Sequence, residues 1–132
     1  MLVQTMRLGL LLLFGCHGAF AAEAELTNNS FQRYFAQTRA CLSSSNYAQC
    51  LPNYLQDTIR RPADNVTQQA FIQQLQVKPE LRKQFKDCFS IEAQVALRST
   101  NHIVFVNKQM ACSATRIDER WLLEQFYHFY AD

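Results

Sequence analysis

The chain has 132 residues and a formal net charge of only +2 at pH 7, because 13 Lys and Arg are nearly balanced by 11 Asp and Glu. This balance argues against nucleic-acid binding, which depends on a strongly basic face that displaces counterions from the phosphates. All three glycines lie within the first 18 residues, so the rest of the chain has no glycine-rich loop of the kind that cradles phosphates.

Residues 1–21 have the pattern of a secretory signal peptide. Arg7 provides a positive charge, a short apolar run follows, and a cleavage motif of small residues ends at Ala21. The apolar run is far shorter than the roughly 20 residues of a transmembrane helix, and no later segment comes close to that length. We therefore expect cleavage after Ala21, or alternatively after Ala24. Cleavage after Ala21 leaves residues 22–132 as one exported domain without a transmembrane segment.

A lipid anchor is an alternative to this cleavage. Leu13–Cys16 resembles a bacterial lipoprotein box, although Phe14 stands where that box usually has a smaller residue. Lipidation at Cys16 would tether the protein to a membrane surface after export. By either route we expect a periplasmic or secreted protein.

The first half of the chain predicts helices. A cap at Asn29 or Ser30 begins the first helix, which ends at 43–46. Its apolar stripe recurs at helical spacing and consists of Phe31, Tyr34, Phe35, Thr38, Cys41 and Leu42. We expect one further turn at 46–50 and a second helix that begins near Pro52, because proline is tolerated at the first helical position.

Two more predicted helices follow a connector at 60–64. Asp64 or Asn65 is placed to cap the third helix, and Pro79 is placed to begin the fourth. The fourth helix turns four apolar side chains inward, namely Leu81, Phe85, Cys88 and Phe89.

The last forty residues predict a sheet. Apolar and polar residues alternate in 91–99, which places one apolar set on a single face of a strand: Ile91, Ala93, Val95 and Leu97. Three more strands are expected at Ile103–Val106, at Met110–Ile117 and from Trp121 onward. The predicted fold class is α+β, with N-terminal helices packed on a C-terminal antiparallel four-stranded meander.

Four cysteines remain when Cys16 is set aside, and an even number in an exported chain indicates two disulfides. They are Cys41, Cys50, Cys88 and Cys112. No C-x-x-C motif occurs, so neither a zinc site nor a thiol-redox site is indicated. The first two lie on the inner stripes of helical segments joined by a short loop. We therefore expect Cys41 to pair with Cys50, which leaves Cys88 to tie the last helix to a strand through Cys112.

The aromatic tail is the candidate pocket or interface. Its members are Trp121, Phe126, Tyr127, His128, Phe129 and Tyr130. Strict alternation puts Trp121 and Tyr127 on one face of the last strand, and Phe126 and His128 on the other. The strand is either buried on both sides, or one of its faces lines a ligand pocket or a protein-binding patch.

Little in the sequence points to catalysis. The two histidines beyond the signal segment are His102, expected to be exposed at a strand start, and His128. His128 could serve as an acid or base if its face lined a pocket. Nucleophile-elbow, zinc-protease and P-loop motifs do not occur, nor does a cluster of His and carboxylates. We therefore predict no catalytic residue, no metal and no cofactor.

The segment Thr115–Tyr127 resembles the end of nuclear transport factor 2-like domains, which are α+β proteins with a cystatin-like fold. Many exported members end in a hairpin with a charged turn, a Trp and a final strand of this kind, and Asn46–Cys50 is similar to their early helix break. The resemblance implies helices before a sheet and a cone-shaped pocket. It implies no particular activity, because members range from enzymes to binding modules.

These observations favour an exported, disulfide-stabilised, non-enzymatic binding or interaction protein, and an inhibitor or immunity-type role would fit this description. The expected partner is another protein. The alternative is a small-molecule-binding or weakly catalytic pocket protein, with His128 and Tyr130 as its polar groups.

Overall fold

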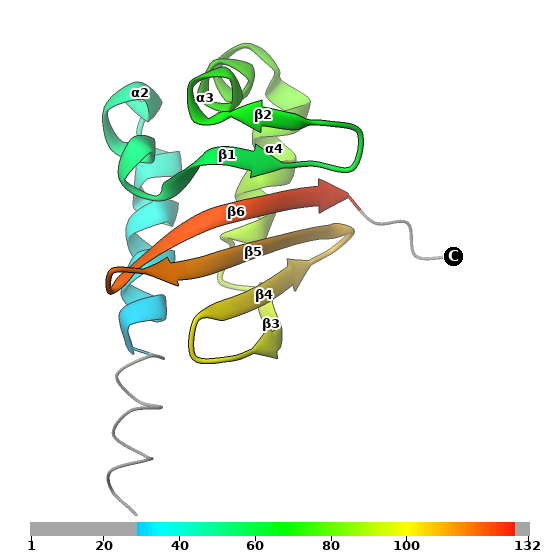
Figure 1. Ribbon diagram of the computed structural model, residues 1–132. Coiled ribbons are helices and arrows are strands. Elements are labelled where there is room, and N and C mark those ends of the chain that lie inside the picture. The colour runs from blue at the N-terminus through cyan, green and yellow to red at the C-terminus, as the bar shows by residue number, and fades with distance from the viewer. Residues whose placement is uncertain (1–28, 129–132) are drawn as a thin grey trace, which may run out of the picture.

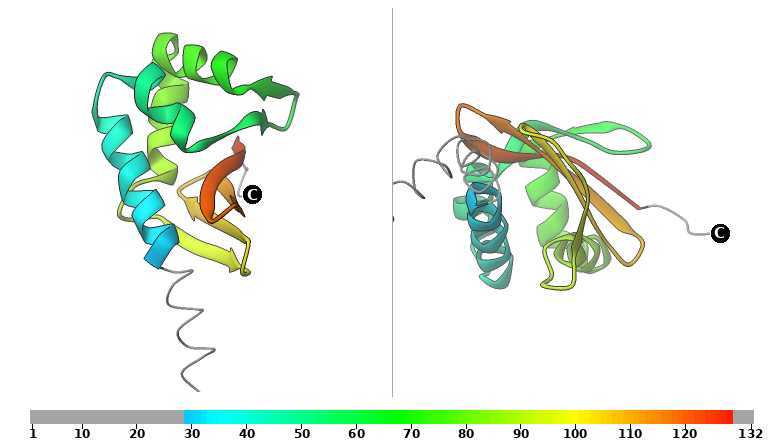
Figure 2. Two further views of the ribbon diagram at one scale, coloured as in Figure 1. Left: turned by 60° about the vertical axis from the view of Figure 1, so that its left-hand side comes forward. Right: turned by 90° about the horizontal axis from the view of Figure 1, so that it is seen from below.

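The computed structural model describes residues 29–128, which form an α+β fold of helices on one face of a mixed sheet (Figure 1). Both views in Figure 2 show the helices gathered on that face. The predicted fold class is therefore confirmed at the level of α+β. The predicted signal segment 1–21, Cys16, Phe129 and Tyr130 lie outside the described residues.

The helices come first, apart from one hairpin between them. Residues 29–43 form a long helix, followed by α2 (Tyr47–Cys50), the short 3-10 helix η1 (Leu51–Asn53), α3 (Gln68–Val77) and α4 (Pro79–Cys88). The strands are β1 (Leu55–Arg60), β2 (Asn65–Thr67), β3 (Gln94–Arg98), β4 (His102–Asn107), β5 (Met110–Ile117) and β6 (Arg120–His128). Within residues 29–128, no helix is long and apolar enough to cross a membrane.

The sheet has six strands in the order β2-β1-β6-β5-β4-β3. Strands β3 to β6 form the predicted antiparallel meander, but the prediction of four strands was wrong. Strand β1 pairs in parallel with β6, and β2 pairs with β1 in an antiparallel hairpin. Through this parallel pairing, β1 and β2 extend the sheet beyond β6, at the edge of the meander opposite β3.

The predicted helix from Pro52 is instead η1 followed by β1. Leu55 and Ile59 are both buried, and a spacing of four residues fits one face of a helix as well as one face of a strand. The third helix begins later than predicted, because Asn65–Thr67 pairs with β1 as a strand. Thr67, not Asp64 or Asn65, caps α3 by accepting a hydrogen bond from the Ala70 amide at 3.2 Å.

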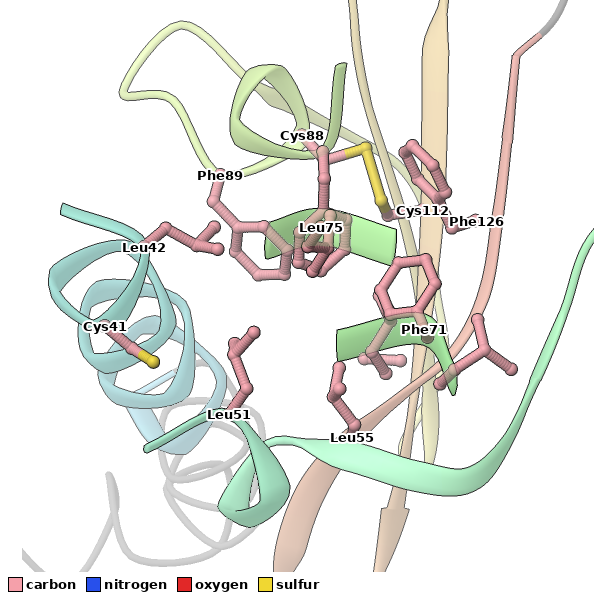
Figure 3. Packing of buried hydrophobic residues seen from close by; sticks show 14 of the residues in the cluster. Cys41, Leu42, Leu51, Leu55, Phe71, Leu75, Cys88, Phe89, Cys112 and Phe126 are labelled. Carbon is pink, nitrogen blue, oxygen red and sulfur yellow. A yellow bond between two sulfur atoms is a disulfide. The ribbon is translucent and has the colours of Figure 1, made fainter. Parts of the chain in front are cut away.

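The core is a chain of aromatic rings between the helices and the sheet. Phe31 of the long helix meets Phe105 of β4 at 5.5 Å between ring centroids. At the other end, Phe85 of α4 lies 5.1 Å from Phe71 of α3 and 5.2 Å from Phe126 of β6. Figure 3 shows Phe71 and Phe126 facing each other beside the Cys88–Cys112 bridge. Aromatic pairs of this kind add about 0.5–1.5 kcal/mol each to simple burial.

Both predicted disulfide pairings are present. Cys41 is bonded to Cys50 with 5.8 Å between the Cα atoms, and Cys88 to Cys112 with 6.1 Å. The first bridge joins the long helix to α2, and the second joins α4 to β5. Both layers of the fold are thus linked covalently.

A bulge in β3 changes which side chains share a face. Val95 lies opposite Phe105 and Leu97 lies opposite Val104, so Ala96 is an extra residue without a partner of its own on β4. Phe105 is a core residue on the helix side, which places Val95 on the helix side and Leu97 on the outer side. The predicted single apolar face through Val95 and Leu97 was therefore wrong.

A second bulge lies in β6. Leu123 pairs with Ala114 and Gln125 with Ser113, which leaves Glu124 as the extra residue. The bulge brings Phe126 to the helix side, where Trp121 and Leu123 are also buried. The predicted placement of Trp121 and Phe126 on opposite faces was wrong for this reason.

Candidate binding surfaces

The structure divides the predicted aromatic site. Trp121 and Phe126 are only 3% and 1% exposed. The Trp121 indole N–H donates a hydrogen bond to the Ser30 hydroxyl at 2.8 Å, and its ring meets Phe31 edge-on. These two aromatics belong to the core. Tyr127 and His128 are half-buried, so the described part of the tail does not form one continuous patch.

Most of the exposed large apolar side chains lie instead at one end of the sheet, on and next to β3. The described residues include five exposed large hydrophobic side chains, and three of them fall within seven residues: Ile91 at 82% exposure, Val95 at 38% and Leu97 at 59%. We call residues 91–98 the β3 edge. The alternation had placed these side chains together on one strand face, and it gave no indication that they form an exposed surface.

The β3 edge is exposed because β3 is the last strand of the sheet. Among the described strands only β4 pairs with it, and all five of its residues are exposed. Proteins usually protect such an edge with lysine, proline or a covering segment. Here the strand has neither lysine nor proline, and Arg98 is its one charged residue.

A groove of about 330 Å³ runs between the long helix and the β3 edge. Its apolar part comprises Phe31, Phe35, Ala36, Ile91, Ala93, Val95 and Phe105, and its polar part Gln32, Arg39 and Gln94. Arg39 is the one charged residue among these, with its guanidinium carbon 5.7 Å from the centroid of the Phe35 ring. The groove therefore combines aromatic and aliphatic side chains with polar groups, and its lining residues carry a single positive charge.

A polar cluster lies on the outer face of the sheet around Glu124. His102 Nε2 lies 2.8 Å from Glu124 Oε1, Ser113 donates to the same oxygen at 3.5 Å, and Arg60 lies 3.7 Å from Oε2. His102, predicted to be exposed, is half-buried and paired. The sequence did not indicate this contact, because it depends on the bulge at Glu124.

The Glu124 cluster does not have the order of a catalytic triad. In a triad the histidine stands between the hydroxyl and the carboxylate, so that it can take the proton of the nucleophile. Here the carboxylate stands between Ser113 and His102. Ser113 is also fully buried. The cluster therefore joins neighbouring strands and does not activate a nucleophile.

His128 lines a separate cavity of about 400 Å³ between α4 and the β4–β5 turn. The other lining residues are Glu80, Lys83, Gln84, Asp87, Lys108, Gln109 and Met110. Lys108 lies 3.4 Å from an Asp87 carboxylate oxygen, and Asn107 donates to the Asp87 carbonyl at 2.8 Å. Charges of both signs line this recess, which suits a polar ligand better than an apolar one.

Tyr34 is a buried titratable group outside these surfaces. Its hydroxyl makes no hydrogen bond of acceptable geometry within residues 29–128. Burial raises the pKa of the phenol well above its ordinary value, against a smaller opposing contribution from the Thr38 side chain. The group stays neutral across the physiological range and faces other rings, including Tyr54 and Phe89. It is a packing residue.

Metal ligands do not gather anywhere in residues 29–128, where no group of three or more His, Cys, Asp or Glu side chains could hold an ion. No protein-family model matches the chain, and no curated protein matches it significantly. Any assignment of function therefore rests on the chain's own surfaces.

Proposed function

We propose that this protein is exported, is stabilised by its two disulfides, and acts by binding another protein without catalysing a reaction. The observation that carries the proposal is the concentration of exposed apolar side chains on the β3 edge. Exposed apolar patches bounded by polar surface are typical of interaction sites. An inhibitor or immunity-type role would use such a surface.

The energetics favour a covered edge. Full burial of an aliphatic side chain contributes about 1.5–3 kcal/mol, and Ile91 and Leu97 retain most of that potential contribution because they remain largely exposed. An unpaired apolar strand is also prone to self-association. A partner that covers the edge would remove both disadvantages.

The cysteine bridges support the proposed location. Structural disulfides persist in oxidising compartments such as the periplasm and the extracellular space. Together with the signal-like segment at 1–21, they favour a periplasmic or secreted protein. The proposal includes cleavage after Ala21.

Mass measurement of the mature protein tests this processing. We predict an N-terminus at Ala22, because the small-residue motif ends at Ala21. A mass that matches a chain beginning at Glu25 would show that cleavage occurs at the alternative site, after Ala24. A lipid-modified N-terminal Cys16 would contradict the prediction and establish the membrane-tethered form.

Binding is tested with three immobilised forms of the mature protein in a periplasmic extract of the source organism. Wild type and the variants Ile91→Lys and Val77→Lys are compared; Val77 is a matched control, because it is also a largely exposed aliphatic side chain but lies on α3. We expect one protein to be retained by wild type and Val77→Lys and lost with Ile91→Lys. Retention by all three forms, or by none, contradicts binding through the β3 edge.

A small-molecule site is the second candidate function, and the His128 cavity is the observation that favours it. The resemblance to nuclear transport factor 2-like domains remains part of this alternative, because that class includes pocket proteins. A fragment library of small polar acids and amines, monitored by amide NMR, would test it. Shifts at His128 and Lys83 that disappear in a folded His128→Ala variant would support it, and unchanged binding would exclude a role for His128.

A further inference from the structure

We infer that the β3 edge is a strand-addition site, at which an extended segment of the partner pairs with the backbone of β3. This inference rests on the proposed protein-binding function and specifies the chemistry of the partner. The segment would be extended, apolar at alternating positions, and acidic where it passes Arg39 and Arg98.

The backbone of β3 provides the first argument. One side of the strand pairs with β4, and no described strand pairs with the other. Its outward N–H and C=O groups therefore repeat along an open edge. Only an extended chain can satisfy such a row in a regular ladder, which is why exposed edges bind peptides by strand addition. A helical partner would leave these groups unpaired.

The side chains provide the second argument. Because of the bulge at Ala96, Val95 lies on the helix side of the edge and Leu97 on the outer side. An added strand directs alternate side chains to both sides. Those on the helix side would reach the mouth of the groove over Phe35 and Phe105, and those on the outer side would contact Leu97. Both faces of the edge can thus bury apolar side chains.

Charge provides the third argument. Arg98 lies opposite Ile103, a core residue, so it projects from the helix side of the sheet, the side on which Arg39 lines the groove. Neither guanidinium takes part in an ion pair recorded among the described residues. No carboxylate lines the groove. Acidic side chains on the partner would be attracted to this side of the edge, which presents two arginines.

Selection of phage-displayed random dodecapeptides on the mature, oxidised protein tests the inference without a known partner. We expect enriched peptides to alternate apolar residues and to carry an acidic residue. The substitution Val95→Lys should lower the affinity of these peptides by about tenfold or more, because it places an ammonium group beside the apolar side chains of the groove. The matched control is Ile117→Lys, since Ile117 is similarly exposed at 43% but lies at the far end of β5. It should leave affinity within about twofold. Failure to enrich any peptide overturns the inference.

Backbone methylation separates strand addition from side-chain docking. Successive amide groups of an extended peptide point to opposite edges. Methylating every second amide of an enriched peptide gives two forms that differ only in phase. We expect the form that blocks the β3-facing amides to lose about tenfold or more in affinity, and the other to bind normally. Equal binding by both forms overturns strand addition.

The arginines are tested separately. The double variant Arg39→Gln and Arg98→Gln should remove the advantage of acidic over amide-containing peptides, whereas Arg33→Gln, on the same helix but outside the groove, should preserve it.

If the extract experiment recovers a partner that depends on Ile91 while both methylated forms bind equally, the protein-binding function stands and only strand addition fails. If selected peptides bind as expected but the extract yields no partner, the site stands and the proposed function fails.

Discussion

Tyr34 buries a hydroxyl group that has no hydrogen-bond partner within residues 29–128. Tyr47 is buried to the same extent, 5% exposed, but its hydroxyl donates to the Leu42 carbonyl at 3.1 Å. A buried polar group without a partner destabilises the fold, whereas a paired one contributes about 1 kcal/mol. The two tyrosines therefore form a natural comparison.

We predict opposite effects for the same substitution at these positions. Tyr34→Phe should raise the free energy of unfolding by about 1 kcal/mol, and Tyr47→Phe should lower it by about 1 kcal/mol. Urea denaturation of the oxidised protein measures both. A loss of stability in Tyr34→Phe would show that the hydroxyl is satisfied by a group outside the described residues.

Tyr34 also predicts a dependence on alkaline pH. Burial raises the pKa of its phenol in the folded protein, whereas in the unfolded chain the group ionises near pH 10. Above that pH the unfolded chain releases a proton that the folded protein retains, so the free energy of unfolding falls as pH rises. We therefore expect the stability advantage of Tyr34→Phe over wild type, measured as the difference in free energy of unfolding, to increase between about pH 9 and pH 11. A constant difference across that range would contradict this account.

At the level of elements, the two bulges decide which residues are exposed. Alternation in the sequence correctly predicted strands near β3 to β6, because four apolar-rich segments are separated by recognisable turns. It could not predict that Ala96 and Glu124 would each be an extra residue. One bulge separates Val95 from Leu97, and the other joins Phe126 to the core face. The candidate site moved from the aromatic tail to the β3 edge for this reason.

The hairpin of β1 and β2 was missed for a different reason. Leu55 and Ile59 satisfy helical and strand spacing equally, and the choice depends on pairing with β6, which is remote in sequence. The disulfides could be predicted because cysteine spacing and helix faces are local properties of the sequence. Pairing between strands that are distant in the sequence is not a local property, so it could not be predicted in the same way.

The two disulfides should differ in their contribution. Cys41–Cys50 spans 9 residues and Cys88–Cys112 spans 24, so loop-closure entropy predicts about 2.5 and about 3.5 kcal/mol respectively. Replacing both cysteines of a pair by alanine should therefore destabilise the protein more at Cys88–Cys112, whose side chains are also fully buried. Urea midpoints of the two double variants measure this order. Equal or reversed losses would contradict it.

For the whole molecule, the helices lie on one face of the sheet (Figure 2), and a groove lies between the long helix and the β3 edge. The α+β class, the helical half and the meander could be predicted from the sequence because each follows from local periodicity. The predicted meander already had residues 91–99 as an end strand, but local periodicity could not predict that the other edge of the meander would be covered. The parallel contact between β1 and β6 covers that edge and leaves β3 as the open edge of the meander.

Amide hydrogen exchange of β3 tests the central claim most directly. In the free protein, the outward-facing amides of Gln94–Arg98 should exchange rapidly, because no described strand protects them. In a complex with the partner or a selected peptide, they should slow by about a hundredfold, as expected for amides that enter a ladder. Binding that protects other segments and leaves the β3 amides unchanged would contradict the claim that this edge is the binding site.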